Sequence, residues 1–240
     1  MGAAVGAALR GNGHDVLWAS RERSPDTMRR AEEAGLRDVE SVGALLAEAD
    51  VVFSIVPPHA AGAVAADAVG LVGLFVDANA VSPATVRELA PARLVDGGLI
   101  GPPPLHPGTT RLYLSGDEAE DVASLFAGSP LDARVIDGGV GAASALKMVY
   151  AAWSKGTAAL LLAIRDVARA TGVEASLLDE WSESVPELLD RLPRAERAAD
   201  AKGWRWIGEM EEIADTFAAA GRPDGFHRAA AQVYREWAAP

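Results

Sequence analysis

The chain has 240 residues, of which 50% are hydrophobic and 23% are charged, so it can bury a core and is not expected to be disordered. Its net charge of −12 argues against nucleic acids and anionic membrane surfaces as partners, because both bind clustered Lys and Arg. The absence of cysteine excludes disulfides, thiolate zinc sites and a cysteine nucleophile.

The first part of the chain alternates the patterns of strands and helices. Strands are predicted at residues 14–19, 51–56, 71–77, 94–100, 111–115 and 134–136, and helices at residues 25–34, 83–89 and 118–126. Strands that alternate with helices indicate βαβ units and a parallel sheet. No apolar run is long enough to span a bilayer, and the histidines lack metal-ligand spacing, so we expect a cytoplasmic protein without a metal site.

From residue 142 onward only helical patterns occur. Helices are predicted at residues 142–170, 175–190, 209–219 and 225–237, with Gly172, Pro193, Gly221 and Pro223 between them. The sequence therefore predicts an α/β fold with two domains. Residues 1–140 form a Rossmann-type, doubly wound parallel sheet, and residues 141–240 form an all-α domain that begins with a long interdomain helix.

Residues 1–9 form an apolar helix of small residues that is typical of the start of a dinucleotide-binding fold. Gly2 fits the third glycine of the G-x-G-x-x-G fingerprint, where the helix N-terminus binds the pyrophosphate of the cofactor. The alternative is an alanine-rich helix that only packs on the sheet.

The strand and the first two glycines of this fingerprint do not precede Gly2. That strand is central in the doubly wound order, so we expect the reading frame to begin about ten residues upstream. Each large buried side chain contributes about 1.5–3 kcal/mol, so the loss of the strand rivals the whole stability of a domain. Without it, we expect an incomplete pyrophosphate site and low or absent activity.

The strand predicted at residues 14–19 is followed by Ser20, Arg21 and Arg23. An NAD-binding enzyme usually has an acidic residue at this strand end, where it binds the ribose hydroxyls. A serine followed by two arginines is suited to a 2′-phosphate, so the sequence predicts NADP (NADPH) as the cofactor. The alternative is that these arginines are solvated residues at the start of a helix.

Several segments together resemble the β-hydroxyacid dehydrogenase family, which includes 3-hydroxyisobutyrate and 6-phosphogluconate dehydrogenases, and especially its branch with a distinctive C-terminal helical domain. The resemblance covers essentially the whole chain. It implies that Val56, Pro57 and Pro58 lie beneath the cofactor and that Asn79 lies near the nicotinamide. The most specific match is GGVGAASALK, residues 138–147, which resembles the stretch that opens the interdomain helix of the family.

The resemblance makes Lys147 the general acid/base that acts on a hydroxyl or carbonyl group. A lysine on an apolar helix face beside a closed cleft is suited to this role, because desolvation disfavours its charged form. Its cation also stabilises a developing alkoxide. The alternative is a surface lysine whose apolar stem lies along the helix.

The chain departs from the family in the residues expected to bind substrate. Ile100 replaces the serine of the substrate loop, Asn79 and Ala80 replace a Ser-Thr pair, and Ala151 replaces an asparagine one turn after Lys147. These changes put the usual small hydroxyacid substrate in doubt. We predict substrate contacts from Ile100, Gly101, Pro102, Tyr150, Ser154 and Glu209, while Ser144 is a further candidate and His227 is either a second acid/base or a core residue.

The sequence thus predicts an oxidoreductase that transfers hydride between NADPH and a small carbonyl or hydroxyl substrate. The alternatives are a catalytically impaired nucleotide-binding protein and an imine reductase-like enzyme, which Lys147 disfavours. The helix at residues 142–170 carries Leu160, Leu161, Leu162 and Ile164, more apolar surface than a small domain covers. Since such helices pack across dimer interfaces in the resembled family, we expect a homodimer through the C-terminal helical domain.

Overall fold

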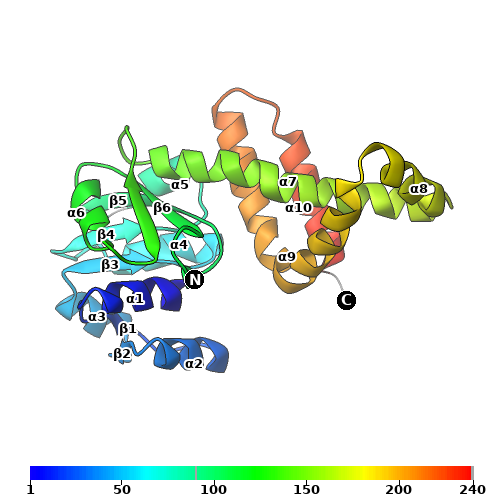
Figure 1. The fold of residues 1–240 in the computed structure, drawn as a ribbon. Coiled ribbons are helices and arrows are strands. Elements are labelled where there is room, and N and C mark those ends of the chain that lie inside the picture. The colour runs from blue at the N-terminus through cyan, green and yellow to red at the C-terminus, as the bar shows by residue number, and fades with distance from the viewer. Residues whose placement is uncertain (90, 239–240) are drawn as a thin grey trace. The chain divides into compact units, whose positions relative to one another are not determined.

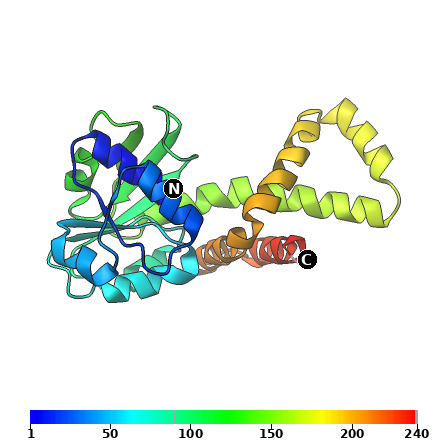
Figure 2. The same cartoon turned by 90° about the horizontal axis from the view of Figure 1, so that it is seen from below.

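The computed structural model describes residues 1–89 and 91–238 (Figure 1). The chain divides into two compact units, Met1–Lys147 and Met148–Pro240. Helix α7, Ala142–Ala170, begins in the first unit and continues into the second as one uninterrupted helix, with the bounds predicted from the sequence (Figure 2). The division follows Lys147 rather than residue 140, because the first residues of α7 pack against the sheet.

The first unit alternates short strands and helices in the predicted α/β manner. Its elements are α1 (Gly2–Gly11), β1 (Leu17–Trp18), α2 (Pro25–Glu33), β2 (Arg37–Asp38), α3 (Val42–Glu48), β3 (Val51–Ser54), α4 (Pro58–Asp67), β4 (Leu74–Asp77), α5 (Pro83–Arg87), β5 (Leu94–Ile100), β6 (Thr110–Ser115), α6 (Ala119–Ser124) and β7 (Leu131–Val135).

The main sheet has the order β3-β4-β5-β6-β7. Strands β3, β4 and β5 are parallel, and β7 is parallel to β6, but β6 pairs antiparallel with β5. The predicted parallel sheet is thus confirmed, within the described residues, for three of the four strand pairs, and the β5–β6 pair is the antiparallel exception. A parallel pairing needs a crossover of a dozen or more residues, usually a helix, whereas residues 101–109 form a short, proline-rich connection.

Strands β1 and β2 form a separate parallel sheet, and β1 has no ladder with β3 in the part of the chain that the structure describes. The break falls where the sequence analysis expected the missing central strand. Helix α1 spans this break, because its core cluster includes Val16 beside β1 as well as Val51 and Phe53 of β3. One edge of β3 is thus left without a strand partner.

The two faces of the main sheet bury alternate residues of each strand, as expected for a sheet covered on both sides. Val76 of β4 packs with α1 and α6 in one cluster, whereas Phe75 packs with α3 and α4 in another. Both side chains are fully buried. Helices α3 and α4 were not predicted, because α3 is short and the prolines that open α4 mark the end of a strand.

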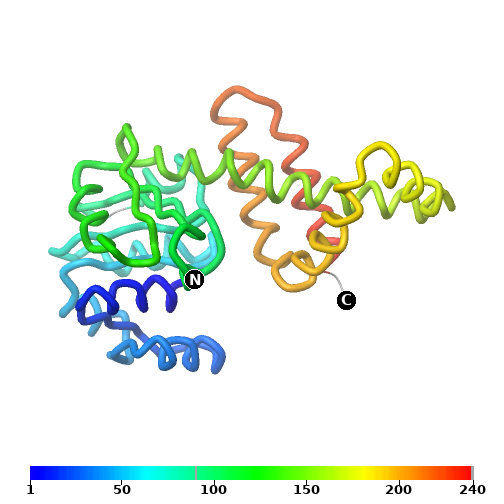
Figure 3. Tube along the Cα trace, viewed as in Figure 1, coloured from blue at the N-terminus to red at the C-terminus, as the bar shows by residue number. Residues whose placement is uncertain are grey.

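The second unit is helical, as predicted, with α8 (Glu174–Ser184), α9 (Glu187–Ala219) and α10 (Gly225–Trp237) following α7. Figure 3 shows the later part of α9 and α10 running side by side, and these two helices are in contact. Across residues 1–89 and 91–238, no helix is both long enough and apolar enough to cross a lipid bilayer.

Pro193 lies inside α9 rather than ending a helix. The sequence analysis used this proline as a break, because an interior proline removes a backbone hydrogen bond. Here burial outweighs that loss: Leu192 belongs to the same core cluster as Leu161 of α7 and Trp181 of α8. Tertiary packing therefore overrides the local preference.

Candidate active site

The carboxyl ends of β3 and β4 are joined by the side chain of Asn79. Its Oδ1 accepts a hydrogen bond of 2.6 Å from the backbone N–H of Val56, and its Nδ2 donates to Ser54 Oγ at 2.9 Å and to Asp77 Oδ2 at 2.6 Å. Asn79 is buried. It fixes the segment that carries Val56, Pro57 and Pro58, so these residues predicted to contact the cofactor lie at one edge of the sheet.

The N-terminus of α1 lies beside this same segment. A Cβ placed on Gly2 would be 3.8 Å from Ile55 Cβ, just after β3. No side chain caps α1 through a hydrogen bond. The structure therefore brings together Gly2, Val56 and Asn79, and it directs the positive end of the α1 dipole to that edge.

The Ser20–Arg23 segment forms an exposed turn after β1. Arg23 donates its backbone N–H to Ser20 at 3.1 Å, and Glu22 has a left-handed backbone with φ of 62°. Ser24 then caps α2, where its hydroxyl accepts from Thr27 N–H. Among the described residues, Arg21 and Arg23 form no salt bridge, so this turn presents two arginines to solvent.

An acidic side chain lies close to this turn on the end of β2. The hydroxyl of Ser20 and the backbone N–H of Glu40 hold the pKa of the Asp38 carboxyl below its usual value. Ser20 is therefore bonded to Asp38 in this structure. The turn thus carries cationic groups suited to a phosphate, and Asp38 beside it offers a carboxylate suited to ribose hydroxyls.

Lys147 lies in the first turns of α7 and is half-buried. Its amine donates a hydrogen bond to the carbonyl oxygen of Leu99 on β5. Leu99 lies next to the carboxyl end of β5, and β5 runs parallel to β4 and β3, so Lys147 lies at the edge that holds Asn79 and Val56. The predicted acid/base and the predicted cofactor residues thus share one edge of the sheet.

A buried carboxylate holds the N-terminus of α7. Asp96 Oδ2 accepts from the backbone N–H groups of Gly141 and Ser144, both at 2.9 Å, and from Ser115 Oγ at 3.2 Å. Asp96 Oδ1 accepts from Ser144 Oγ at 2.6 Å. Asp96, Ser115 and Ser144 are all fully buried. Asp96 therefore caps the start of α7 and also accepts a hydrogen bond from the Ser144 hydroxyl, a capping role that was not predicted from the sequence.

The predicted substrate loop follows β5 directly. Ile100 is buried, whereas Gly101 and Pro102 are exposed. Gly101 has φ of 125°, and a Cβ there would be 2.4 Å from the backbone oxygen of Thr109, so only glycine fits. The hydroxyl of Thr110 donates to the Pro102 carbonyl and closes the base of the loop.

The remaining predicted substrate residues belong to the second unit. Tyr150 and Ser154 are exposed on α7, at spacings of three and seven residues from Lys147 that place them near its face. Glu209 is buried on α9 and forms an ion pair with Lys155 of α7. Substrate binding by these three side chains stays a prediction.

His227 is a core residue of the second unit. Its ring lies 4.2 Å from that of Phe217 and 5.4 Å from that of Phe226, measured between centroids. Burial lowers its pKa, although the nearby Asp224 opposes the shift. Its Nδ1 is buried without a hydrogen-bond partner in the described residues.

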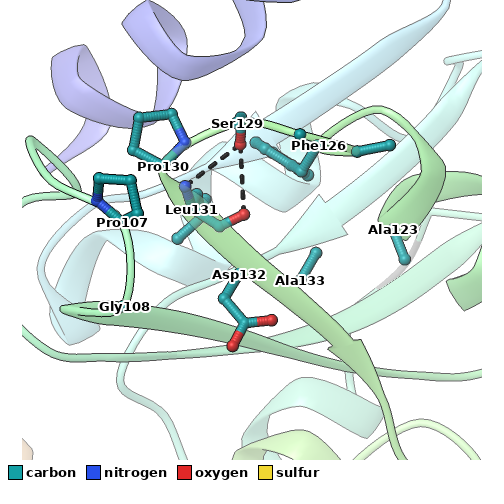
Figure 4. Close-up of a pocket in the computed structure, with 11 residues that line it drawn as sticks. Pro107, Gly108, Ala123, Phe126, Ser129, Pro130, Leu131, Asp132 and Ala133 are labelled. Atoms are coloured by element: carbon teal, nitrogen blue, oxygen red, sulfur yellow. Dashed lines mark hydrogen bonds between the residues drawn. The ribbon is translucent and has the colours of Figure 1, made fainter.

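A separate cavity of about 330 Å³ lies beside the start of β7 (Figure 4). Pro107 and Gly108, Phe126 and Leu131 contribute to its wall. The Ser129 hydroxyl is used within the turn, where it donates to the Leu131 carbonyl and accepts from the Leu131 N–H, both at 3.2 Å. None of the predicted site residues lines this cavity, and we assign it no function.

Comparison with known proteins shows which family the chain belongs to. Residues 168–237 match a family model described as a domain of unknown function, DUF1932. An uncharacterized 28.5 kDa protein of Methanothermus fervidus, from the 7S RNA 5′ region, is 32% identical over 179 residues, which cover 72% of this chain and 68% of that protein. The solved structure of the conserved protein MTH1747, reported as similar to 3-hydroxyacid dehydrogenases, is 27% identical with a TM-score of 0.69 and covers 98% of this chain and 92% of its own. The chain belongs to the β-hydroxyacid dehydrogenase superfamily.

Within this superfamily the chain also shares its fold with Mycobacterium tuberculosis 3-hydroxyisobutyrate dehydrogenase. That structure is 21% identical, has a TM-score of 0.70, and matches over 99% of this chain and 90% of its own. In this chain the DUF1932 match, residues 168–237, falls in the helical second unit. The chain therefore has the distinctive C-terminal helical domain expected from the sequence.

Proposed function

We propose that the protein is an NADPH-dependent oxidoreductase that transfers hydride between the cofactor and a small, hydroxyacid-like carbonyl or hydroxyl substrate. The observation that carries the proposal is the hydrogen bond from the Lys147 amine to the Leu99 carbonyl oxygen, near the carboxyl end of β5. Ligands of open α/β sheets bind at the carboxyl ends of the strands. Val56 and Asn79 lie at that same edge.

The residues at this edge fit parts of a dinucleotide. The N-terminus of α1 at Gly2 would hold the pyrophosphate, because its N–H groups and dipole favour an anion. Arg21 and Arg23 would hold the 2′-phosphate, and the Val56–Pro58 segment would lie under the ring end. The nicotinamide supplies or accepts the hydride when the cofactor is bound.

Lys147 would move the proton. As an ammonium it donates a proton to the oxygen of a carbonyl substrate, and as an amine it accepts the proton of a hydroxyl substrate. The bond to Leu99 orients Nζ, and the positive charge stabilises a developing alkoxide oxygen. Ile100, Gly101 and Pro102 would contact the substrate. Tyr150 and Ser154 are proposed from their positions near the helical turns of Lys147, and Glu209 from the family resemblance.

A test of the function combines binding with turnover. NADPH binding is measured by fluorescence titration, and NADPH oxidation is then followed with a panel of keto acids and, in a separate arm, cyclic imines. We expect binding and the reduction of at least one keto acid. Reduction of imines alone would favour the imine reductase-like alternative. Failure to bind NADPH would refute the proposal.

A second candidate is a nucleotide-binding protein without efficient turnover. It is favoured by the break between β1 and β3, because the first strand of a doubly wound sheet leads into the pyrophosphate-binding turn. NADPH binding without oxidation by any member of the panel supports this candidate.

We also propose that the protein is a homodimer through α7. Val149, Trp153, Leu160 and Val167 are 44–66% exposed, and spacings of four and seven residues place them along one stripe of the helix. Leu161 and Leu162, in contrast, are buried within the second unit. A second copy of the same helix face would cover the stripe, because heptad spacing suits packing against a helix.

A further inference from the structure

The carboxylate of Asp96 lies between the sheet and the helix that carries Lys147. It accepts four hydrogen bonds, from Ser115 Oγ, from the backbone N–H groups of Gly141 and Ser144, and from Ser144 Oγ. Ser115 is the partner of Asp96 in the β5–β6 ladder, and its Oγ also accepts from Ala143 N–H at 3.0 Å. Asp96 and Ser115 together therefore bind three of the N–H groups at the start of α7.

The Asp96 carboxylate forms no direct salt bridge within the described residues, although the Arg87 guanidinium lies beside Gly141, whose N–H donates to Asp96. Asp96 is fully buried. Its charge is compensated by the hydrogen bonds and by the positive end of the 29-residue helix α7. These hydrogen bonds fix the position of the start of α7 along β5.

Two further contacts fix α7 on the same strand. Gly98 lets the helix approach closely, because a Cβ there would be 2.8 Å from the Ala143 carbonyl oxygen and 3.2 Å from Lys147 Cβ. One residue farther along β5, the Leu99 carbonyl accepts the bond from the Lys147 amine. Ser144 and Lys147 are three residues apart and lie on neighbouring positions of one helix face. The hydrogen bonds from Ser144 to Asp96 thus fix the position of the Lys147 Cβ on the helix.

We propose that Asp96 is a positioning residue for Lys147: its buried carboxylate sets the height and rotation of α7 on β5, so that the amine reaches the Leu99 carbonyl. The consequence for catalysis rests on the proposed function, but the placement of the amine does not. Asp96 touches neither substrate nor cofactor in this account. Loss of the Asp96 acceptor atoms would release the Lys147 amine from the Leu99 carbonyl, whereas loss of the Asp96 charge alone would not.

The lysine content of the chain allows a direct test. There are three lysines, Lys147, Lys155 and Lys202. Lys202 is exposed on α9 and serves as the internal reference, and Lys155 is held by Glu209 in the second unit and serves as the distant control. Trace acetylation followed by peptide mass spectrometry gives the reactivity of each amine separately, without any substrate.

Two substitutions separate the acceptor atoms from the charge. Asp96→Asn keeps an oxygen for the Gly141 and Ser144 N–H groups and offers its amide to the Ser144 hydroxyl. Asp96→Ala removes every acceptor. We expect the Lys147-to-Lys202 labelling ratio to rise about fivefold in Asp96→Ala, the equivalent of one hydrogen bond of about 1 kcal/mol. The ratio should stay at the wild-type value in Asp96→Asn, and Lys155 should not change.

The variant Ser115→Ala covers the case in which Asp96→Ala does not fold. It removes one donor to Asp96 and the acceptor for Ala143 N–H but leaves the carboxylate in place, so the ratio should rise in the same direction. An unchanged ratio in Asp96→Ala, or in Ser115→Ala if the former is unfolded, would overturn the proposal. In an active preparation, Asp96→Ala should lower kcat while the affinity for NADPH stays unchanged. Labelling decides the proposal even if no turnover is found.

Discussion

The amine of Lys147 donates a hydrogen bond to the backbone carbonyl of Leu99, and this bond joins the start of α7 to the end of β5. Parallel strands β3 and β4 end at the same edge, where Asn79 links Ser54, Val56 and Asp77. A proton-transfer group and the segments predicted to bind a dinucleotide are thereby brought to one place.

The first prediction concerns the choice of cofactor. Arg21 and Arg23 are exposed beside Ser20, so the protein should bind NADPH at least about tenfold tighter than NADH, or about 1.4 kcal/mol. Replacing both arginines by alanine should remove this preference by weakening NADPH binding alone. Titration of both cofactors measures the effect. Arg29→Ala is the control, because Arg29 is also exposed but pairs with Asp26 and Glu33 on α2.

A preference for NADH would count against the phosphate site. It would instead favour Asp38, which is bonded to Ser20 at the end of β2, as the residue that binds the ribose hydroxyls.

The second prediction concerns the break in the sheet. A designed N-terminal extension with an apolar strand and two glycines, spaced so that Gly2 is the third glycine of the fingerprint, should pair with the open edge of β3. Added ladder bonds and buried side chains should raise the Tm by at least about 5 °C. The affinity for NADPH should rise as well. Calorimetry and fluorescence titration provide the measurements.

The matched control is an extension of equal length with a proline in the centre of the strand, since proline cannot donate to a ladder. Equal melting temperatures for the two extended chains would show that the break does not accept a strand.

The third prediction concerns assembly. Leu160→Glu introduces a charge into the exposed stripe of α7 and should convert a dimer into a monomer at micromolar concentration, as measured by light scattering. Ala66→Glu, which introduces the same charge at an exposed position of α4 in the first unit, should leave the dimer intact. If the wild-type chain is itself a monomer under these conditions, the proposed interface is wrong.

The fourth prediction concerns pH. Burial lowers the pKa of His227, so below the usual value of about 6.5 the unfolded chain binds a proton that the folded chain does not. The contribution of His227 to stability is therefore complete above this value and decreases as the pH falls toward the lowered pKa, by at most about 1.4 kcal/mol per pH unit.

Urea unfolding at several pH values between 7.5 and 5 measures this effect. His227→Leu keeps an apolar side chain between Phe217 and Phe226 but removes the titrating ring, so its free energy of unfolding should depend less on pH in that window. Identical pH profiles for the two proteins would disprove the assignment.

Much of the fold follows from the sequence, because long apolar patterns determine it. The bounds of α7 and β5 agree with the prediction, since one is a long alanine- and leucine-rich helix and the other a continuous buried strand. Strand β2 has only two exposed residues and gives no hydrophobic pattern. The continuity of α9 through Pro193 could not be predicted either, because it depends on contacts with α7 and α8.

The candidate site could be predicted only in part. Lys147 was found through its glycine-rich flank, which has a recognisable spacing. The role of Asp96 depends on hydrogen bonds to residues 19 to 48 positions away, which no local pattern reveals. The pairing of Glu209 with Lys155, 54 residues apart, is equally a product of tertiary structure.

The substitution of Lys147 tests the central claim most directly. With a substrate identified from the panel, Lys147→Ala should lower kcat by at least about 100-fold, the usual contribution of a general acid/base, while NADPH binding and the fold are retained. Lys147→Arg should not restore turnover, because a guanidinium keeps its proton near neutral pH. The measurement is kcat for the wild type and both variants beside their NADPH affinities. A loss confined to kcat is the predicted result, and wild-type turnover in Lys147→Ala would contradict the account.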